Sequence, residues 1–395
     1  MRTIDIDSLG LDEGALLLIR HALAALPAGA TLQVQGLAGD AAIHLAAWCR
    51  AQGHGLVVDA GTARLTRAAH AEGRWQGAVA TGSAWLAGDE LPAAEADPAW
   101  GFAARGATVD ASTPPIEFAL RRRDELWAAT AGELYRQAAA AQWDPAAAID
   151  WDAPFELAVE TEAAVVQVMT YLIENENAAL VVPARHLGQL HPHYREVQQF
   201  LALQCADEAR HVEVFTRRAT LRGHAPALST AGGQASLKTL LDAPDFSSAV
   251  FLLSVLGEGS FVNLLNFLHE HAPDPVTREI TRLAARDEAR HVAFGMAHLE
   301  HRLACEPDYR ARLHNAVELR YDTLAGTAGL NEEVYDALVL LAAGALAPAA
   351  VRRGHAAVQA LVQQMAAGRR ARLARLGFGR DDALRLAELH TRNFM

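Results

Sequence analysis

The spacing of apolar and polar residues changes once along the chain, near residue 70. Before that point apolar residues alternate over four short stretches, which predicts strands, and recur at helical spacing over two longer ones, which predicts helices. The strands are expected at 3–6, 31–34, 56–58 and 63–66, and the helices at 13–26 and 40–52. This order, strand–helix–strand–helix–strand–strand, predicts a small two-layer α/β domain at residues 1–70.

Glycine and proline interrupt the next stretch, residues 71–115. They recur from Gly73 to the pair Pro114-Pro115 at intervals too short for a packed element, which indicates a linker or an irregular cover. From residue 116 to residue 395 apolar residues recur at helical spacing, and the chain is rich in alanine and leucine. The fold predicted for the whole chain is therefore mainly α, a four-helix bundle that follows a small α/β domain.

One six-residue string occurs twice within the predicted helices. Residues 207–212 read Asp-Glu-Ala-Arg-His-Val, and residues 287–292 repeat them without change. Residues three apart on a helix are surface neighbours, so Glu208 with His211, and Glu288 with His291, can each hold one metal ion. Two such pairs predict a site for two metal ions.

Hairpin symmetry adds one carboxylate to each pair. In an antiparallel helical hairpin, two residues lie at the same height when the turn lies midway between them in sequence. The midpoints of Glu258 with Glu288 and of Glu176 with Glu208 both fall on prolines in the expected turns. Glu174 would shift its midpoint by one residue and remains an alternative to Glu176.

The predicted ligand set contains four carboxylates and two imidazoles, all directed into one bundle. Its members are Glu176, Glu208, His211, Glu258, Glu288 and His291. One Glu from each of two helices and a Glu-x-x-His from each of the other two is the arrangement of ferritin-like di-iron and di-manganese proteins. Carboxylate and imidazole donors suit iron or manganese. Two iron ions are expected, with manganese or a mixed Mn/Fe pair as alternatives.

The residues beside the ligands are expected to support them. A metal-bound histidine usually donates its second ring N–H to a carboxylate or a carbonyl group. Asp207 and Asp287 can fill that role across the bundle, and Arg210 and Arg290 can balance their charge.

Residues 150–300 resemble ferritin-like di-iron oxidases and oxygenases, and the doubled Asp-Glu-x-Arg-His motif is similar to that of bacterial di-iron monooxygenase hydroxylases. The resemblance implies a helical bundle, two irons bridged by carboxylates, and reaction with O2. The expected function is oxidation of a small organic substrate by O2. The sequence has no dinucleotide fingerprint or iron–sulfur spacing, so a separate electron donor, or the substrate itself, is expected to supply electrons.

Residues 4–67 resemble the TusA-like sulfur carriers through three segments, 9–11, 26–34 and 49–54. That family carries its reactive cysteine just after the first of these segments, where this chain has Asp-Glu-Gly-Ala at 12–15. Without that thiol no persulfide can form there, so the resemblance implies a docking or scaffolding module.

Two other functions remain open at this point. One is iron handling by a ferritin-like protein without substrate oxidation, and the other is an adaptor in sulfur trafficking. The long additions on both sides of the bundle argue against iron storage, and the missing cysteine argues against sulfur transfer.

Composition limits the partners and the compartment. The 35 Lys and Arg against 47 Asp and Glu give a net charge of −12, which argues against nucleic acid and anionic membranes. The apolar stretches 249–268 and 337–351 contain Glu258 and Pro348, so both are expected to be buried bundle helices. Three widely spaced cysteines indicate reduced thiols in a cytoplasmic protein.

The remaining notable side chains are expected to have structural or surface roles. Glu162 is expected in solvent. Tyr171 and His298 are expected in the core; the alternatives are a substrate pocket or radical path for Tyr171 and support of the metal ligands for His298. The histidines expected at the surface or as caps are His186, His191 and His193. The arginines expected on a solvated face or in a homodimer contact are Arg352, Arg353, Arg369, Arg370, Arg372 and Arg375.

Overall fold

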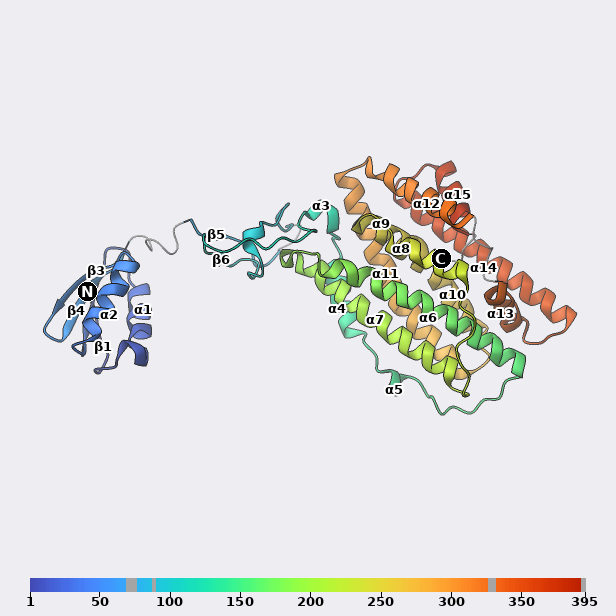
Figure 1. The fold of residues 1–395 in the computed structure, drawn as a ribbon, viewed down its shortest axis with the longest axis horizontal. Helices are drawn as coiled ribbons and strands as arrows, with labels where there is room; N and C mark the ends of the chain where they lie inside the picture. Colours follow the sequence, from blue (N-terminus) through green and yellow to red (C-terminus); the bar gives the residue numbers. More distant parts are fainter. Residues whose placement is uncertain (69–76, 87–89, 326–331, 392–395) are drawn as a thin grey trace. The chain divides into compact units, whose positions relative to one another are not determined.

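The computed structural model of the chain describes residues 1–68, 77–86, 90–325 and 332–391. Its residue contacts divide it into two compact units (Figure 1). One unit comprises residues 1–91 and 97–117, and the other comprises residues 92–96 and 118–395. The finer division at residues 70 and 115 stays a prediction.

The first unit begins with a four-stranded sheet covered by two helices. Its strands are β1 (Arg2–Asp5), β2 (Thr31–Gln35), β3 (Gly55–Asp59) and β4 (Thr62–Thr66), in the spatial order β1-β2-β4-β3. The π-helical turn η1 (Leu11–Ala15) leads into α1 (Leu16–Ala24), and α2 (Ala41–Ala51) follows β2. The helix α1 connects the parallel strands β1 and β2, as such a crossover requires. The predicted two-layer α/β fold is confirmed.

Residues 77–86 and 90–117 carry little regular structure. Strands β5 (Val79–Ala80) and β6 (Thr108–Val109) pair antiparallel, and η2 (Pro98–Trp100) is a single 3₁₀ turn. Gly106 has a φ of 90°, and a Cβ there would lie 2.7 Å from the Cα of Ala84. Turns of this kind depend on glycine, which explains the composition of this stretch.

The second unit is a ferritin-like four-helix bundle, as predicted. The first hairpin joins α6 (Val159–Leu187) through η3 (Pro192–Tyr194) to α7 (Arg195–Thr220). The second joins α9 (Phe246–Val250), η4 (Phe251–Glu258) and α10 (Gly259–Glu270) to α11 (Pro275–Cys305). Figure 1 shows the long helices α6, α7 and α11 side by side.

Shorter helices precede the bundle and a helical layer follows it. The preceding ones are α3 (Arg123–Leu126), α4 (Ala131–Ala140) and α5 (Pro145–Ala148). Helix α8 (Ala231–Leu241) lies between the two hairpins, and the layer that follows the bundle contains α12 (Tyr309–Ala325), α13 (Glu332–Ala343), α14 (Pro348–Arg375) and α15 (Arg380–Thr391). Within this layer α13 packs on α6, and α14 packs on α10.

The bundle core is apolar on both sides of one polar layer. Leu172 and Leu264 belong to an apolar cluster on one side, and Val182 and Val255 belong to another on the opposite side. Glu176 and Glu258 lie between these positions along their helices. The charged groups of this layer are therefore held between two water-excluding layers.

Glu162 is buried, which contradicts the expectation that it is solvated. Its carboxylate accepts a hydrogen bond of 2.7 Å from Arg218, which also donates one of 2.8 Å to Asp274. Burial alone would lower the pKa of the Arg218 guanidinium, but Glu162 and Asp274 raise it. The buried guanidinium requires these carboxylates, and the position of Glu162 on its own helix did not reveal that partner.

The histidines of the first hairpin are also buried, so the expectation of surface positions was wrong. His186, His191 and His193 are at most 3% exposed. His191 accepts a hydrogen bond from the backbone N–H of His193, which makes it a cap, and His193 Nε2 accepts one of 3.1 Å from the N–H of Ala93. Residues distant in the sequence, such as Ala93, therefore bury these histidines.

Two C-terminal arginines depart from the expected solvated face. Arg369 is 1% exposed and Arg372 is mostly buried, whereas Arg375 is exposed and pairs with Glu300. The expectation of a solvated face is therefore confirmed for Arg375 and wrong for Arg369 and Arg372.

One described helical run, Phe246–Glu270, is long and apolar enough to cross a membrane. Within the protein, 89% of its most apolar window is buried, because this run is a core helix of the bundle. The bent pair Glu332–Ala343 and Pro348–Arg375 passes the same test only if both helices count as one span. Neither observation is more than weak evidence for a membrane.

Candidate dimetal centre

Six acidic and imidazole side chains meet in the polar layer of the bundle. Glu176 comes from α6, Glu258 from the end of η4, Glu208 and His211 from α7, and Glu288 and His291 from α11. Each is at most 2% exposed. These are the six residues that the sequence predicts as ligands, and the structure brings all of them together.

The six side chains form two overlapping groups. One contains Glu176, Glu208, His211 and Glu288, and the other contains Glu208, Glu258, Glu288 and His291. Within each group the candidate ligand atoms lie within 4.8 Å of one another. Because Glu208 and Glu288 belong to both, they are placed to bridge two metal ions, while each group keeps one imidazole and one carboxylate of its own.

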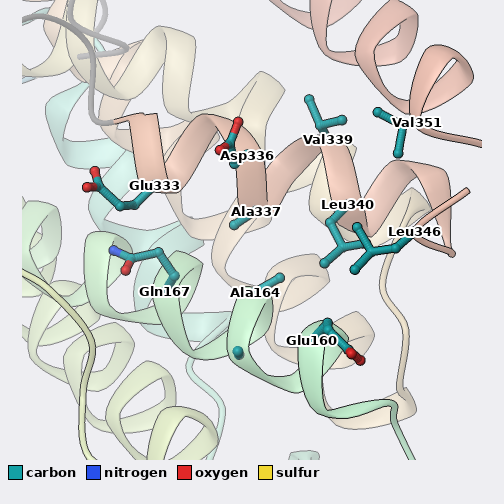
Figure 2. Close-up of a pocket in the computed structure, with 11 residues that line it drawn as sticks. Glu160, Ala164, Gln167, Glu333, Asp336, Ala337, Val339, Leu340, Leu346 and Val351 are labelled. Atoms are coloured by element: carbon teal, nitrogen blue, oxygen red, sulfur yellow. The ribbon is translucent and has the colours of Figure 1, made fainter. Parts of the chain in front are cut away.

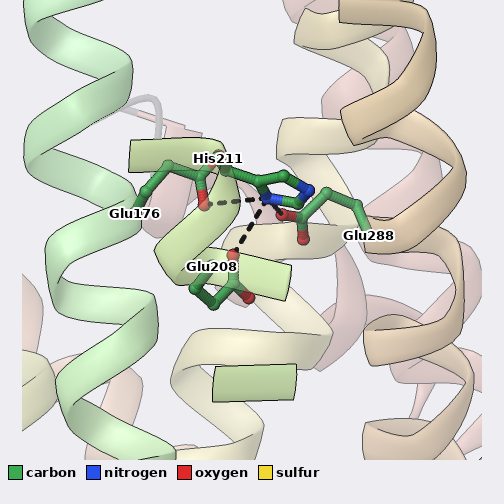
Figure 3. A group of neighbouring side chains, drawn as sticks. All are labelled: Glu176, Glu208, His211 and Glu288. Atoms are coloured by element: carbon green, nitrogen blue, oxygen red, sulfur yellow. Dashed lines mark hydrogen bonds and ion pairs between the residues drawn. The ribbon is translucent and has the colours of Figure 1, made fainter. Parts of the chain in front are cut away.

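Both imidazoles direct Nδ1 toward the carboxylates. His211 Nδ1 lies 3.2 Å from Glu208 and 3.5 Å from both Glu176 and Glu288 (Figure 3). His291 Nδ1 lies 3.0 Å from Glu208 and 3.5 Å from Glu288. The nitrogen that faces the carboxylates is thus the one available to a metal.

The opposite ring nitrogens contact aspartates of the facing motif. His211 Nε2 lies 3.2 Å from Asp287, and His291 Nε2 lies 3.4 Å from Asp207. Since an ionised carboxylate can only accept, each Nε2 carries a proton, which leaves Nδ1 as the nitrogen that a metal ion could use. The two copies of the repeat therefore support each other's histidine.

Side chains from a turn outside the bundle and from the bundle helices hold these aspartates. Trp143 Nε1 donates a hydrogen bond of 2.8 Å to Asp287, and Gln142 donates one of 2.8 Å to Asp207. Arg210 pairs with both aspartates, and Arg290 pairs with Asp287. The contacts with His291 and His211, followed by the hydrogen bonds from Gln142 and Trp143, outweigh burial and lower the pKa values of Asp207 and Asp287 respectively. The structure thus places Arg210 and Arg290 beside both aspartates.

Sequence reasoning missed Gln142 and Trp143. They lie in the turn after α4, 65 and 144 residues from the aspartates that they contact. A polar residue and a tryptophan in a turn give no local signal of that contact. Only the fold reveals it.

Burial and mutual repulsion act on the carboxylates when no ion lies between them. Burial, and then the charge of Glu208, raises the pKa of Glu176 well above its usual value. Burial and the charge of Glu288 do the same for Glu258. Burial alone would lower the pKa values of His211 and His291, but the adjacent Glu176 and Glu208 raise them. Metal ions replace such protons when they bind.

The donor set fits two divalent cations. Six buried atoms of this cluster have no hydrogen-bond partner among the described residues: Glu176 Oε1, Glu208 Oε1, Glu258 Oε2, Glu288 Oε1 and Oε2, and His291 Nδ1. Buried polar groups are almost always satisfied, so these atoms require a ligand. Two divalent ions would also neutralise four carboxylates.

Glu174, the alternative first ligand, lies outside the cluster. It is half-buried and approaches Gly233 of α8, whereas Glu176 is 1% exposed and lies within 3.5 Å of His211. The geometry therefore favours Glu176.

A separate cavity of about 390 Å³ lies between α6, α13 and α14 (Figure 2). Carboxylates at its edge come from Glu160, Glu333 and Asp336, and apolar side chains such as Leu340 line it. None of the six candidate ligands is among the described residues that line it. Gln167, the lining residue of α6 nearest in sequence to Glu176, precedes it by nine residues, which is about 13 Å along a helix.

The α/β domain carries its own cavity of about 440 Å³, lined in part by Asp12, Asp40, His44 and Trp48. Asp12 occupies the stretch where sulfur carriers have their reactive cysteine. Cys49 is buried elsewhere in this domain, and burial raises the pKa of its thiol to about 11. A protonated, buried thiol is unreactive, and the resemblance to sulfur carriers stays a prediction.

No protein-family model and no curated protein matches the sequence. Among solved structures, a point variant of an R2-like ligand-binding oxidase with a Mn/Fe cofactor is 16% identical, with a TM-score of 0.46 over 64% of this chain and 93% of that chain. A protein with aldehyde deformylating oxidase activity from Synechococcus is 17% identical, with a TM-score of 0.42 over 58% and 96%. An R2-like ligand-binding oxidase from Sulfolobus acidocaldarius is 17% identical, with a TM-score of 0.41 over 60% and 89%. At this level the similarity assigns neither activity nor substrate to this chain.

The overlapping groups predict how metal content responds to single substitutions. Glu208→Gln removes a carboxylate common to both groups, so the number of ions per chain should fall from two toward zero. Glu176→Gln affects one group and should leave about one ion. Elemental analysis of purified protein measures this, with Glu174→Gln as the matched control that keeps two ions. Full loading of Glu176→Gln together with loss in Glu174→Gln would reverse the assignment.

The crossed aspartates predict an effect on metal affinity without loss of a ligand. Asp287→Ala leaves His211 without its acceptor, which should weaken metal binding by about 10–100-fold. Competition with a chelator measures the affinity, and circular dichroism checks that the helices are retained. Glu213→Gln, at an exposed position of α7, is the control. An unchanged affinity in Asp287→Ala would show that this contact does not support the site.

Proposed function

We propose that the protein is an O2-dependent dimetal oxidase or oxygenase that acts on a small organic substrate. The observation that carries this proposal is the buried cluster of four carboxylates and two imidazoles in two overlapping groups. Iron, manganese or a mixed pair held there would supply the redox chemistry that O2 activation requires.

The side chains around the cluster have defined tasks in this proposal. Glu208 and Glu288 would contribute to both metal positions, and their anionic oxygens would favour the higher oxidation states that reaction with O2 demands. Asp207 and Asp287 hold the histidines in one tautomer. The two imidazoles would thereby be oriented before a metal ion or a substrate arrives.

The apolar layers keep water away from the reacting groups. Phe200 and Phe294 stack at 4.5 Å between ring centroids, and Phe200 lies beside His291. Charges act more strongly in such a dry environment than in water.

Electrons for the reaction come from a separate donor or from the substrate. The sequence offers no nicotinamide or iron–sulfur motif of its own. We assign the α/β domain a docking role in this scheme, because it lacks the thiol that sulfur transfer would require.

An oxygen-consumption assay tests the proposal. The protein is loaded with Fe(II), Mn(II) or both, supplied with a chemical reductant, and followed with an oxygen electrode. We expect catalytic O2 uptake. Loss of a residue that only supports a ligand lowers activity by up to roughly 100-fold, so Glu208→Gln, which removes a ligand, should lower the rate of uptake further. Glu213→Gln should retain the parent rate.

Two outcomes would contradict the proposal. Uptake that is unchanged in Glu208→Gln would place the reaction elsewhere. Iron accumulation far beyond two ions per chain, with O2 consumed only in proportion to the iron oxidised, would identify iron handling instead.

A further inference from the structure

The two overlapping groups of the metal centre each have one glutamate of their own. Glu176 belongs only to the group that contains His211, and Glu258 belongs only to the group that contains His291. The other two carboxylates are common to both groups. A difference between the two metal positions must therefore come from these two glutamates, from the two histidines, or from the side chains that hold them.

Gln204 holds the glutamate of the His291 group. This side chain lies on α7, is 2% exposed, and places its amide Nε2 3.1 Å from Oε1 of Glu258. Because an ionised carboxylate can only accept, the amide group is the donor in this contact. The second oxygen of Glu258, Oε2, has no hydrogen-bond partner among the described residues. The contact therefore occupies one oxygen of the carboxylate and leaves the other available to a metal ion.

A serine supports the same carboxylate. Ser254 lies in η4, is 2% exposed, and its side chain hydrogen-bonds to Glu258. Gly295 of α11 allows Ser254 to lie there, because a Cβ on this glycine would be 2.7 Å from the Cβ of the serine. Two neutral donors, one from α7 and one from η4, thus fix the orientation of Glu258.

Glu176, the glutamate of the other group, is held differently. Its Oε2 lies 3.5 Å from Nδ1 of His211, and its Oε1 has no hydrogen-bond partner in the described part of the chain (Figure 3). The histidine in this contact is itself a candidate ligand, and Nδ1 is the nitrogen that a metal ion would take. The contact is therefore lost when an ion binds, so that the ion itself must orient Glu176.

The two histidines do not account for a difference between the positions. Each donates from Nε2 to an aspartate of the facing motif, at 3.2 Å for His211 and 3.4 Å for His291. The positions differ in their glutamates instead. A side chain that is already oriented loses less conformational freedom when it binds an ion, so the held glutamate favours the higher affinity.

We propose that Gln204 is a positioning residue, which holds Glu258 ready for a metal ion and makes the position beside His291 the tighter of the two. The inference rests on the proposed function for its metal centre, but it requires no reaction with O2. When metal is scarce, the first ion in each chain occupies the position beside His291. The second ion then completes the centre beside His211.

Crystals that contain less metal than the centre can hold test this order of filling. The parent protein is supplied with one Mn(II) per chain, and anomalous scattering at the manganese edge measures the occupancy of each position. We expect the stronger peak beside His291. Because both peaks are compared within one crystal, a change in overall stability does not produce the difference.

Gln204→Met tests the role of the amide group, because methionine has nearly the same length and no N–H to donate. The affinity for the first ion, measured by competition with a chelator, should fall about 10–100-fold, as it does when other residues that support a ligand are lost. At one Mn(II) per chain, the peak beside His291 should lose its lead over the peak beside His211. Gln199→Met, the same change at an exposed position of α7, should behave as the parent does.

Ser254→Ala provides a second test that removes only a hydroxyl group. It should weaken binding of the first ion several-fold and lower the same peak, because one donor to Glu258 is lost. This variant keeps the test decisive if Gln204→Met does not fold.

Three results would overturn the inference. These are equal peaks or a stronger peak beside His211 in the parent protein, an unchanged affinity in both Gln204→Met and Ser254→Ala, or an equal loss of both ions in these variants, which would indicate a merely structural role. Each of these results leaves the proposed function intact, because the parent centre still binds two ions. If the positions fill as expected but no O2 is consumed, the proposed function fails while the role of Gln204 stands.

Discussion

Mutual repulsion among four carboxylates in one buried layer is the constraint on which the rest of the bundle depends. Glu176, Glu208, Glu258 and Glu288 are almost fully removed from water, and the pKa values of Glu176 and Glu258 rise in response. Buried charges of one sign persist only with a counter-charge close by. Two divalent cations would supply that counter-charge within the layer. Arg210 and Arg290 balance the charges of Asp207 and Asp287, which contact the two histidines.

Much of this layer is visible in the sequence because its geometry is local. The repeat at 207–212 and 287–292 places each Glu–His pair on one helical face, and the turn positions align Glu176 and Glu258 with them. The helical bundle and the small α/β domain also follow from spacing alone. The role of the six residues as metal ligands is a prediction that metal analysis tests.

Other parts of the structure depend on contacts that spacing cannot show. Glu162 was expected in solvent because its partner, Arg218, lies 56 residues away on another helix. Gln142 and Trp143 reach the aspartates from a turn outside the bundle. Likewise Arg369 and Arg372 lie on a basic helix that is typical of a solvated face, and packing of this helix against α10 and α15 buries them.

Crystallographic anomalous scattering at the iron and manganese edges tests the central claim most directly. Crystals of the protein loaded with both metals should show two peaks inside the bundle, one beside His211 and the other beside His291, with Glu208 and Glu288 between them. A single peak, or peaks remote from both histidines, would contradict the assignment of these six residues to a dimetal centre.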